Sequence, residues 1–251
     1  MTEDLLWGKN PVMEAIRAGR PISRVYLQDG MKAAYKTEVL RFCNKNGIPY
    51  QFADRKHLSL MSDNGIHQGI IVQVASKEYM SWEDMIAAAA AKAEPPLLII
   101  LDGVEDPRNL GAILRCADAL GAHGVVIPKN RAVPLTSGVA KASAGAIERM
   151  PVDRVTNISR EIEHMKERGL WIAGADMNNT NIIDQQNLTG PLAVAFGGEG
   201  TGLSRLILEK CDFRISIPMR ERAHSLNVSA AAAVVLYEIS RQRRLAERRS
   251  C

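Results

Sequence analysis

The chain has 251 residues, of which 46% are hydrophobic, and its 32 Lys and Arg against 28 Asp and Glu give a net charge of +4. This composition is enough for a large buried core in one or two domains, and no run of about 18 apolar residues indicates a membrane span. The N-terminal residues MTEDLLWGKN are acidic where an export signal is basic. We therefore expect a soluble, cytoplasmic protein.

The cysteines and histidines show no metal-ligand spacing. None of the four cysteines belongs to a CxxC pair, and the five histidines do not accompany them in a zinc-binding pattern. We expect no metal and no disulfide framework. The pI of about 8.9 and the arginine-rich stretch RQRRLAERRS fit a polyanionic partner, but a solvated helix end explains that stretch equally well.

Residues 1–78 predict a small α/β domain. Short β-rich runs alternate there with helical patterns, over a length that is normal for an independent core. The expected strands are 23–28, 48–53 and 68–75, and the expected helices are 10–18, 34–46 and 55–61.

A helical linker is predicted over residues 79–96. Its alanine run favours a helix, and Pro95 and Pro96 end that helix. We therefore expect a semi-rigid spacer before the rest of the chain.

Residues 97–251 predict a second α/β domain with a mostly parallel sheet, because β-rich runs again alternate with helical patterns. The expected strands are 97–102, 124–128, 170–176, 191–196 and 213–218, and the expected helices are 108–120, 135–147, 202–210 and a long one from about 227.

A first polar cluster, DPRNLGAILRCADALG, follows the strand 97–102. Asp106 is a good N-cap and Pro107 a good first helical residue. Arg108 and Arg115 lie seven positions apart, nearly in line on one helix face, where they form a candidate shelf for phosphate or ribose. From this helix alone, a solvent-facing surface with Arg115 paired to Asp118 is the more ordinary interpretation.

A second cluster, FGGEGTGLS, follows the strand 191–196. A dinucleotide-binding loop would stand in the first βα unit with an acidic residue about twenty positions later, and a phosphate-binding Walker loop needs Gly-Lys-Ser/Thr. This loop fits neither pattern, and Glu199 at its centre would repel an anion. The loop suits a ligand with an adenine and a positive charge.

A third cluster, with Ser225, Asn227 and Ser229, leads into the last helix. Serine and asparagine cap helices in many proteins, so this cluster alone is a weak signal. All three clusters, however, come directly after the carboxyl ends of predicted parallel strands. Those ends share one edge of the sheet, which is where open α/β sheets bind ligands.

In order and at the usual spacing, DPRNLGAILRCADALG, FGGEGTGLS and IPMRERAHSLNVSAAAAVVLYE resemble the three motifs of the SpoU/TrmH-type RNA ribose 2′-O-methyltransferases of the SPOUT superfamily. IHQGIIVQV and the leading domain are similar to the L30e-like, RNA-binding domain of the bacterial members that methylate a guanosine of 23S rRNA. The resemblance covers nearly the whole chain.

The resemblance implies a C-terminal trefoil knot that holds S-adenosyl-L-methionine, a homodimer, and an RNA substrate. The implied catalytic positions are Asn109, Arg115, Glu199, Ser225 and Asn227. The implied cofactor-binding positions are Gly197, Gly198, Ile217, Met219 and Leu226. The family usually has small residues after IPM, whereas this chain has RERAH. We expect Arg220 and Arg222, together with Arg108, to contact RNA.

Arg115 is the family's favoured base, but a guanidinium stays protonated in proteins. We therefore expect Arg115, oriented by Asn109 and Glu199, to stabilise the alkoxide that develops on the ribose hydroxyl. Three alternatives stay open at this point: methylation of tRNA in place of 23S rRNA, an RNA-binding homologue without catalytic activity, and a nicotinamide-dependent reductase.

Overall fold

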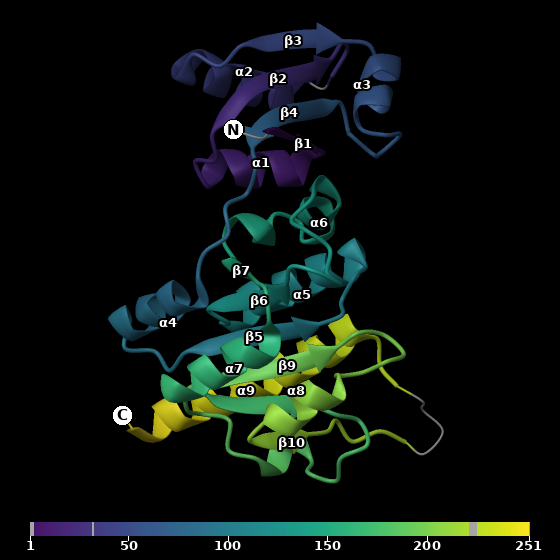
Figure 1. Cartoon of the computed structure of the whole chain (residues 1–251). Coiled ribbons are helices and arrows are strands. Elements are labelled where there is room, and N and C mark those ends of the chain that lie inside the picture. The colour runs from purple at the N-terminus through teal and green to yellow at the C-terminus, as the bar shows by residue number, and fades with distance from the viewer. Residues whose placement is uncertain (1–2, 32, 221–224, 251) are drawn as a thin grey trace. The chain divides into compact units, whose positions relative to one another are not determined.

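The computed structural model describes residues 3–31, 33–220 and 225–250, and it contains two compact units (Figure 1). The first unit is Met1–Glu78 together with Leu135–Arg149, and the second is Tyr79–Pro134 together with Met150–Cys251. The segment 135–149, which the sequence places inside the second domain, therefore packs within the first unit.

The first unit is built on a four-stranded sheet of order β1-β4-β2-β3. β3 is parallel to β2, and the other neighbouring pairs are antiparallel. The strands are β1 (Glu3–Trp7), β2 (Ile22–Gln28), β3 (Tyr50–Ala53) and β4 (Ile70–Ala75), and the helices of residues 1–78 are α1 (Lys9–Arg17), α2 (Ala33–Asn46) and α3 (Arg55–Met61). The sequence patterns predict all of these elements except β1.

The segment 135–149 forms α6 (Ser137–Ala142) and the short 3-10 helix η1 (Ala146–Glu148). The predicted helix 135–147 is broken because Ala144 and Gly145 have positive φ angles of 50° and 89°. Glu148 then accepts a hydrogen bond of 2.8 Å from Arg20 of residues 1–78. Both side chains of this ion pair are buried.

The second unit contains a six-stranded sheet in which all neighbouring strands are parallel, in the order β10-β8-β9-β5-β6-β7. This confirms the predicted mostly parallel α/β fold. The strands are β5 (Leu97–Asp102), β6 (Gly124–Pro128), β7 (Val152–Val155), β8 (Trp171–Ala175), β9 (Leu192–Gly197) and β10 (Phe213–Ile215).

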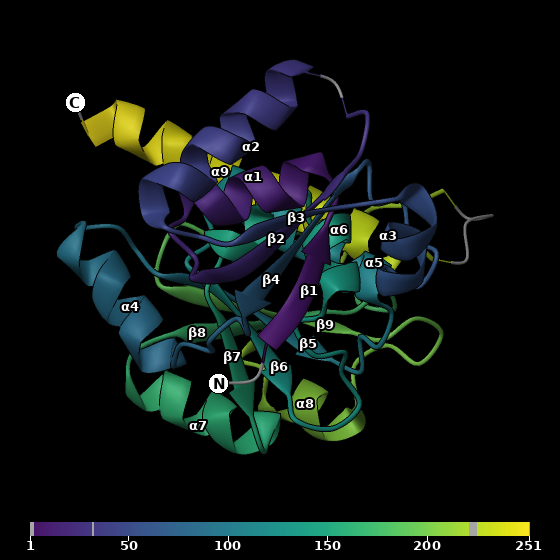
Figure 2. The same cartoon turned by 90° about the horizontal axis from the view of Figure 1, so that it is seen from above.

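Helices cover both faces of this sheet (Figures 1 and 2). α7 and α8 pack side by side on one face, and α5 packs against α9 on the other. The helices are α4 (Trp82–Ala91), α5 (Pro107–Leu120), α7 (Ile158–Glu167), α8 (Arg205–Lys210) and α9 (Val228–Ser250), with a 3-10 turn η2 (Ile183–Gln185). None of the described helices is long and apolar enough to cross a membrane.

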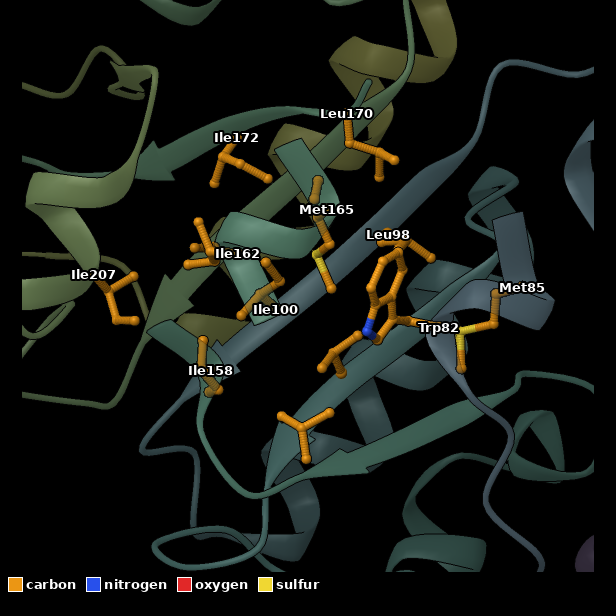
Figure 3. Close-up of a cluster of buried hydrophobic side chains, with 14 of the residues drawn as sticks. Trp82, Met85, Leu98, Ile100, Ile158, Ile162, Met165, Leu170, Ile172 and Ile207 are labelled. Carbon is orange, nitrogen blue, oxygen red and sulfur yellow. The ribbon is translucent and has the colours of Figure 1, made fainter. Parts of the chain in front are cut away.

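The helix α4 lies within the segment predicted as a spacer, but it belongs to the core of the second unit (Figure 3). Trp82 and Met85 are 2% and 1% exposed. The Trp82 backbone N–H donates to Asp153 at 2.9 Å, and the indole Nε1 donates to Glu161 at 3.2 Å. Burial of these two large side chains fixes α4 to the second unit, so the helix does not act as a free spacer.

Candidate functional site

The polar clusters of the sequence meet at the carboxyl edge of the parallel sheet. Asp102 at the end of β5 is directly paired with Gly197 at the end of β9. The segments that leave these two strands, and the segment that leaves β10, therefore begin on the same side of the sheet. The structure thus brings residues more than 100 positions apart into one site.

The start of α5 has the capping predicted from the sequence. The Asp106 carboxylate accepts from the backbone N–H of Arg108 at 2.8 Å, and Pro107 is the first helical residue. Hydrogen bonds from the exposed Arg108 guanidinium also hold the pKa of Asp106 below its usual value. This pairing orients Arg108 at the surface and leaves the next residue, Asn109, facing inward and buried.

Asn227 connects the three clusters. Its Nδ2 donates to Asn109 Oδ1 at 3.1 Å and also to Glu199 Oε1. The first bond joins the start of α5 to the segment before α9, and the second joins that segment to the glycine-rich loop. A single amide group therefore holds together residues from three separate stretches of the chain.

Ser229 fixes the orientation of the Asn227 amide. The Asn227 Oδ1 accepts from the Ser229 backbone N–H at 2.9 Å and from its hydroxyl at 2.6 Å. An amide has one acceptor oxygen and one donor nitrogen, so these two bonds direct Nδ2 toward Asn109 and Glu199. Ser229 stands in the third sequence cluster, but no role in the site was predicted for it.

The glycine-rich loop folds tightly on its own chain. A Cβ at Gly197 would lie 1.9 Å from the carbonyl carbon of Gly202, and one at Gly198 would lie 2.3 Å from the carbonyl oxygen of Gly103. Gly200 and Gly202 have positive φ angles. Close backbone packing therefore requires glycine at Gly197 and Gly198.

A buried carboxylate anchors the end of this loop. Asp102 Oδ2 accepts from the backbone N–H of Ser204 at 3.1 Å, and its side chain is 8% exposed. Arg131 Nη2 lies 3.9 Å from Asp102 Oδ1. The anchor fixes the glycine-rich loop to the end of β5.

A cavity of about 520 Å³ opens beside this loop. Its volume falls within the usual range for small-molecule sites, and a mainly apolar wall with a few polar groups is typical of such sites. Its lining includes the five predicted cofactor-binding residues and three of the predicted catalytic residues: Gly197, Gly198, Glu199, Ile217, Met219, Ser225, Leu226 and Asn227.

The loop after β8 also lines the cavity, and the sequence reasoning missed it. Asp176, Met177 and Asn178 lie there, with Asp176 accepting a hydrogen bond of 3.0 Å from the Asn178 backbone N–H. The signal was available, because Asp176 ends the predicted strand 170–176 of the same parallel sheet and the polar residues 178–179 follow it closely. This loop therefore lies at the same sheet edge as the three polar clusters, for the same reason.

The predicted arginines that the structure describes lie outside the cavity wall. Arg108, Arg115 and Arg220 have exposed side chains, and Arg222 lies outside the described residues. In the described parts of the chain, Arg115 makes no hydrogen bond or ion pair with Asn109, Glu199 or Asn227. Along α5, Arg115 stands about 120° from Asn109. Asn109 and Glu199 both accept hydrogen bonds from Asn227, and their orientation of Arg115 stays a prediction.

The chain matches two family models. Residues 5–80 match the model described as RNA 2′-O ribose methyltransferase substrate binding, and residues 96–237 match that of the SpoU rRNA methylase family. The chain belongs to the SpoU rRNA methylase family. A relative from Bacillus subtilis, described as a putative TrmH family tRNA/rRNA methyltransferase, YacO, is 47% identical over 242 residues, or 96% of each chain.

Solved structures of SpoU-type proteins share the fold of the whole chain. The SpoU methyltransferase AviRb from Streptomyces viridochromogenes, solved in complex with AdoMet, is 25% identical with a TM-score of 0.81, covering 97% of this chain and 91% of AviRb. A structure described as an RNA 2′-O ribose methyltransferase is 26% identical with a TM-score of 0.77, covering 96% and 89%.

Proposed function

We propose that this SpoU-family protein transfers a methyl group from S-adenosyl-L-methionine to a ribose 2′-hydroxyl of RNA, with a guanosine of 23S rRNA as the preferred target. The observation that carries the proposal is the Asn109–Asn227–Glu199 network, in which Asn227 and Glu199 line the cavity. The network joins the three segments that resemble the motifs of the family. Further support comes from the substrate-binding family model that covers residues 5–80.

The cavity fits the proposed cofactor. Its apolar wall contains Ile215, Ile217, Met219 and Leu226, which suit an adenine ring, and backbone groups of the glycine-rich loop supply polar partners. Glu199, an acidic side chain on the same wall, suits a cationic ligand. When bound, S-adenosyl-L-methionine supplies an electrophilic methyl group on a cationic sulfur. Gly197, Gly198, Ile217, Met219 and Leu226 are the residues proposed to hold it.

The polar residues have separate proposed roles. Asn227 and Ser225 position the substrate ribose beside the cavity, and Asn109 and Glu199 hold the Asn227 amide. Arg115 stabilises the alkoxide that develops as the 2′-hydroxyl attacks, because its guanidinium donates hydrogen bonds and cannot serve as a base at neutral pH. The hydroxyl proton passes to water or to a neighbouring acceptor. Arg108, Arg220 and Arg222 contact the RNA backbone.

The same proposal includes the architecture of the family. The first unit is L30e-like, and the segments around β9, β10 and α9 form a trefoil knot around the cofactor. The enzyme is a homodimer that acts in the cytoplasm, where its RNA substrate lies. Support for the dimer comes from α9, which exposes Val234 and Tyr237 at 42% and 54% on one helix face. Analytical ultracentrifugation tests the dimer.

A tRNA target is the second candidate, because the curated relatives carry the description tRNA/rRNA methyltransferase. Mapping of ribose methylation on rRNA and tRNA from a deletion strain, with and without the plasmid-borne gene, tests both targets. Loss and restoration of one 23S rRNA guanosine methylation supports the first target. Loss confined to tRNA supports the second, and an unchanged map in both RNAs argues against the proposed activity.

A further inference from the structure

The strand β3 is an open edge of the first unit's sheet (Figure 1). The Val25 N–H donates to the Pro49 carbonyl at 3.0 Å, and the Asp29 N–H donates to the Ala53 carbonyl at 3.1 Å. In a parallel ladder, alternate residues of one strand bond to the same neighbour. The backbone N–H and C=O groups of the intervening Tyr50 and Phe52 therefore point away from β2 and are available to a ligand.

Two aromatic side chains stand on this edge. Tyr50 and Phe52 are two positions apart and share one face of the strand, with 41% and 37% of their surface exposed. Their ring centroids lie 5.9 Å apart in an edge-to-face arrangement. Lys36 of α2 places its Nζ 4.4 Å from the centre of the Phe52 ring. Exposed aromatic rings beside a cation are the groups on which nucleic-acid bases stack.

The charge of the chain also concentrates in this unit. The first unit has 13 Lys and Arg against nine Asp and Glu, whereas the second has 19 of each. Arg55 and Lys56 begin α3, one residue after β3, and have exposed side chains, while the intervening Asp54 caps that helix by accepting from the His57 N–H. Lys36, Arg55 and Lys56 therefore give the aromatic edge the positive charge that a phosphate backbone requires.

We propose that the β3 edge (Lys36, Tyr50, Phe52, Arg55 and Lys56) binds an unpaired segment of the RNA substrate, with bases stacked on Tyr50 and Phe52 and phosphates beside the three cations. This inference rests on the proposed function and names the surface of the first unit that contacts RNA. An added peptide strand is the competing occupant of an open edge. The cations and the adjoining aromatic rings favour single-stranded RNA.

The test compares variants of the full-length protein in binding a fluorescein-labelled 12-nucleotide oligouridylate, measured by fluorescence anisotropy. The variant with Tyr50→Leu and Phe52→Leu keeps apolar bulk and loses both rings. We expect it to bind roughly ten- to a hundredfold more weakly. The double variant Tyr50→Phe, Phe52→Tyr keeps two aromatic rings. It should bind within about threefold of the wild type, since stacking needs only an aromatic face.

Trp171→Leu is the matched control, because Trp171 is an aromatic residue that is 60% exposed in the second unit. It should leave oligouridylate binding unchanged. A double-leucine variant that binds within twofold of the wild type overturns the inference. So does equal binding of oligouridylate and a hairpin duplex of the same length.

A second measurement uses the wild-type protein alone. Photocrosslinking with 4-thiouridine in the oligonucleotide, followed by trypsin, should label the peptide 46–55, which contains both rings. Crosslinks found only in other peptides contradict the inference. A methyl-transfer assay separates this inference from the proposed function. If the proposed function is wrong, the wild type transfers no methyl group to RNA. If only this inference is wrong, the wild type and the double-leucine variant transfer methyl groups equally well.

Discussion

The Asn227 side-chain amide donates a hydrogen bond of 3.1 Å to Asn109 Oδ1, across 118 positions of the chain. The same nitrogen donates to Glu199, so one amide joins the start of α5, the glycine-rich loop and the segment before α9. Since Ser229 supplies both donors to the amide oxygen, the network has one orientation.

Asn227→Asp keeps the shape of the side chain and removes both donors. It also places a second carboxylate beside Glu199. We expect kcat/KM for methyl transfer to fall by roughly ten- to a hundredfold, which is the effect of losing a hydrogen bond to a charged group. Asn187→Asp is the matched control, because the Asn187 Oδ1 only accepts hydrogen bonds, from Thr189, and a carboxylate keeps them. Wild-type activity in Asn227→Asp contradicts the role given to the network.

Arg115→Ala should reduce the rate of methyl transfer by about two to four decades, because it removes a group that stabilises the developing alkoxide. Arg115→Lys should restore the rate only in part, since an ammonium does not reproduce the planar set of guanidinium donors. Calorimetry should give wild-type affinity for S-adenosyl-L-methionine in both variants. Near-normal turnover in either variant would show that Arg115 has another role.

Gly198→Ala should destabilise the second unit by about 1–3 kcal/mol, because its Cβ would lie 2.3 Å from the Gly103 carbonyl oxygen. Gly190→Ala is the control. Its Cβ would have no neighbour within 4 Å, and its effect should stay within about 0.5 kcal/mol. Urea denaturation measures both, and equal stabilities would mean that the loop can move away from Gly103 at little cost.

Glu148→Gln should destabilise the first unit by about 1.5–3 kcal/mol, because the Arg20 guanidinium loses its buried carboxylate partner and keeps only the partly exposed Asp4, at 3.6 Å. Glu14→Gln affects pairs with Arg17 and Arg149, which are 65% and 49% exposed, and should cost less than about 1 kcal/mol. Thermal and urea unfolding compare the two. If the order were reversed, the segment 135–149 would not be fixed to the first unit by this ion pair.

His67 should make the first unit sensitive to mild acid. Burial lowers the pKa of His67 below the usual histidine value of 6.5, and Nδ1 accepts a hydrogen bond of 3.1 Å from the Gly69 N–H. The unfolded chain therefore takes up a proton more readily than the folded one, and stability present above pH 6.5 is lost as the pH falls below it.

The comparison for this pH effect is between His67→Asn, which keeps an acceptor for Gly69, and His57→Asn, which alters an exposed histidine. Melting temperatures at pH 7.5 and pH 5.5 measure the effect. The wild type and His57→Asn should lose more stability between these two pH values than His67→Asn. Equal losses in all three proteins would assign the acid sensitivity to other groups.

Much of the site could be predicted from the sequence, because the carboxyl ends of parallel strands share one edge of the sheet. Strand runs such as LLIILD and PLAVAF are buried and parallel, so the polar segments that follow them necessarily meet. The cap by Asp106 and the first-turn Pro107 are local features and were also predicted correctly. The cavity-lining loop at Asp176 was open to the same argument.

Other features have no local signal. The four-residue strand β7 is too short for alternation to identify it. The packing of 135–149 with the first unit depends on contacts such as Arg20 with Glu148, which are 128 positions apart. The partners of Asn109 and Glu199 depend on the orientation that Ser229 gives to one amide, and that orientation is a property of the folded chain alone.

The central claim is methyl transfer to a ribose hydroxyl, and alkaline hydrolysis of the product tests it most directly. RNA from the deletion strain is incubated with the purified protein and tritiated S-adenosyl-L-methionine and then hydrolysed with alkali, which cleaves only next to a free 2′-hydroxyl. The account predicts tritium in alkali-resistant dinucleotides. Tritium in mononucleotides, which marks base methylation, or no incorporation into any RNA, would contradict it.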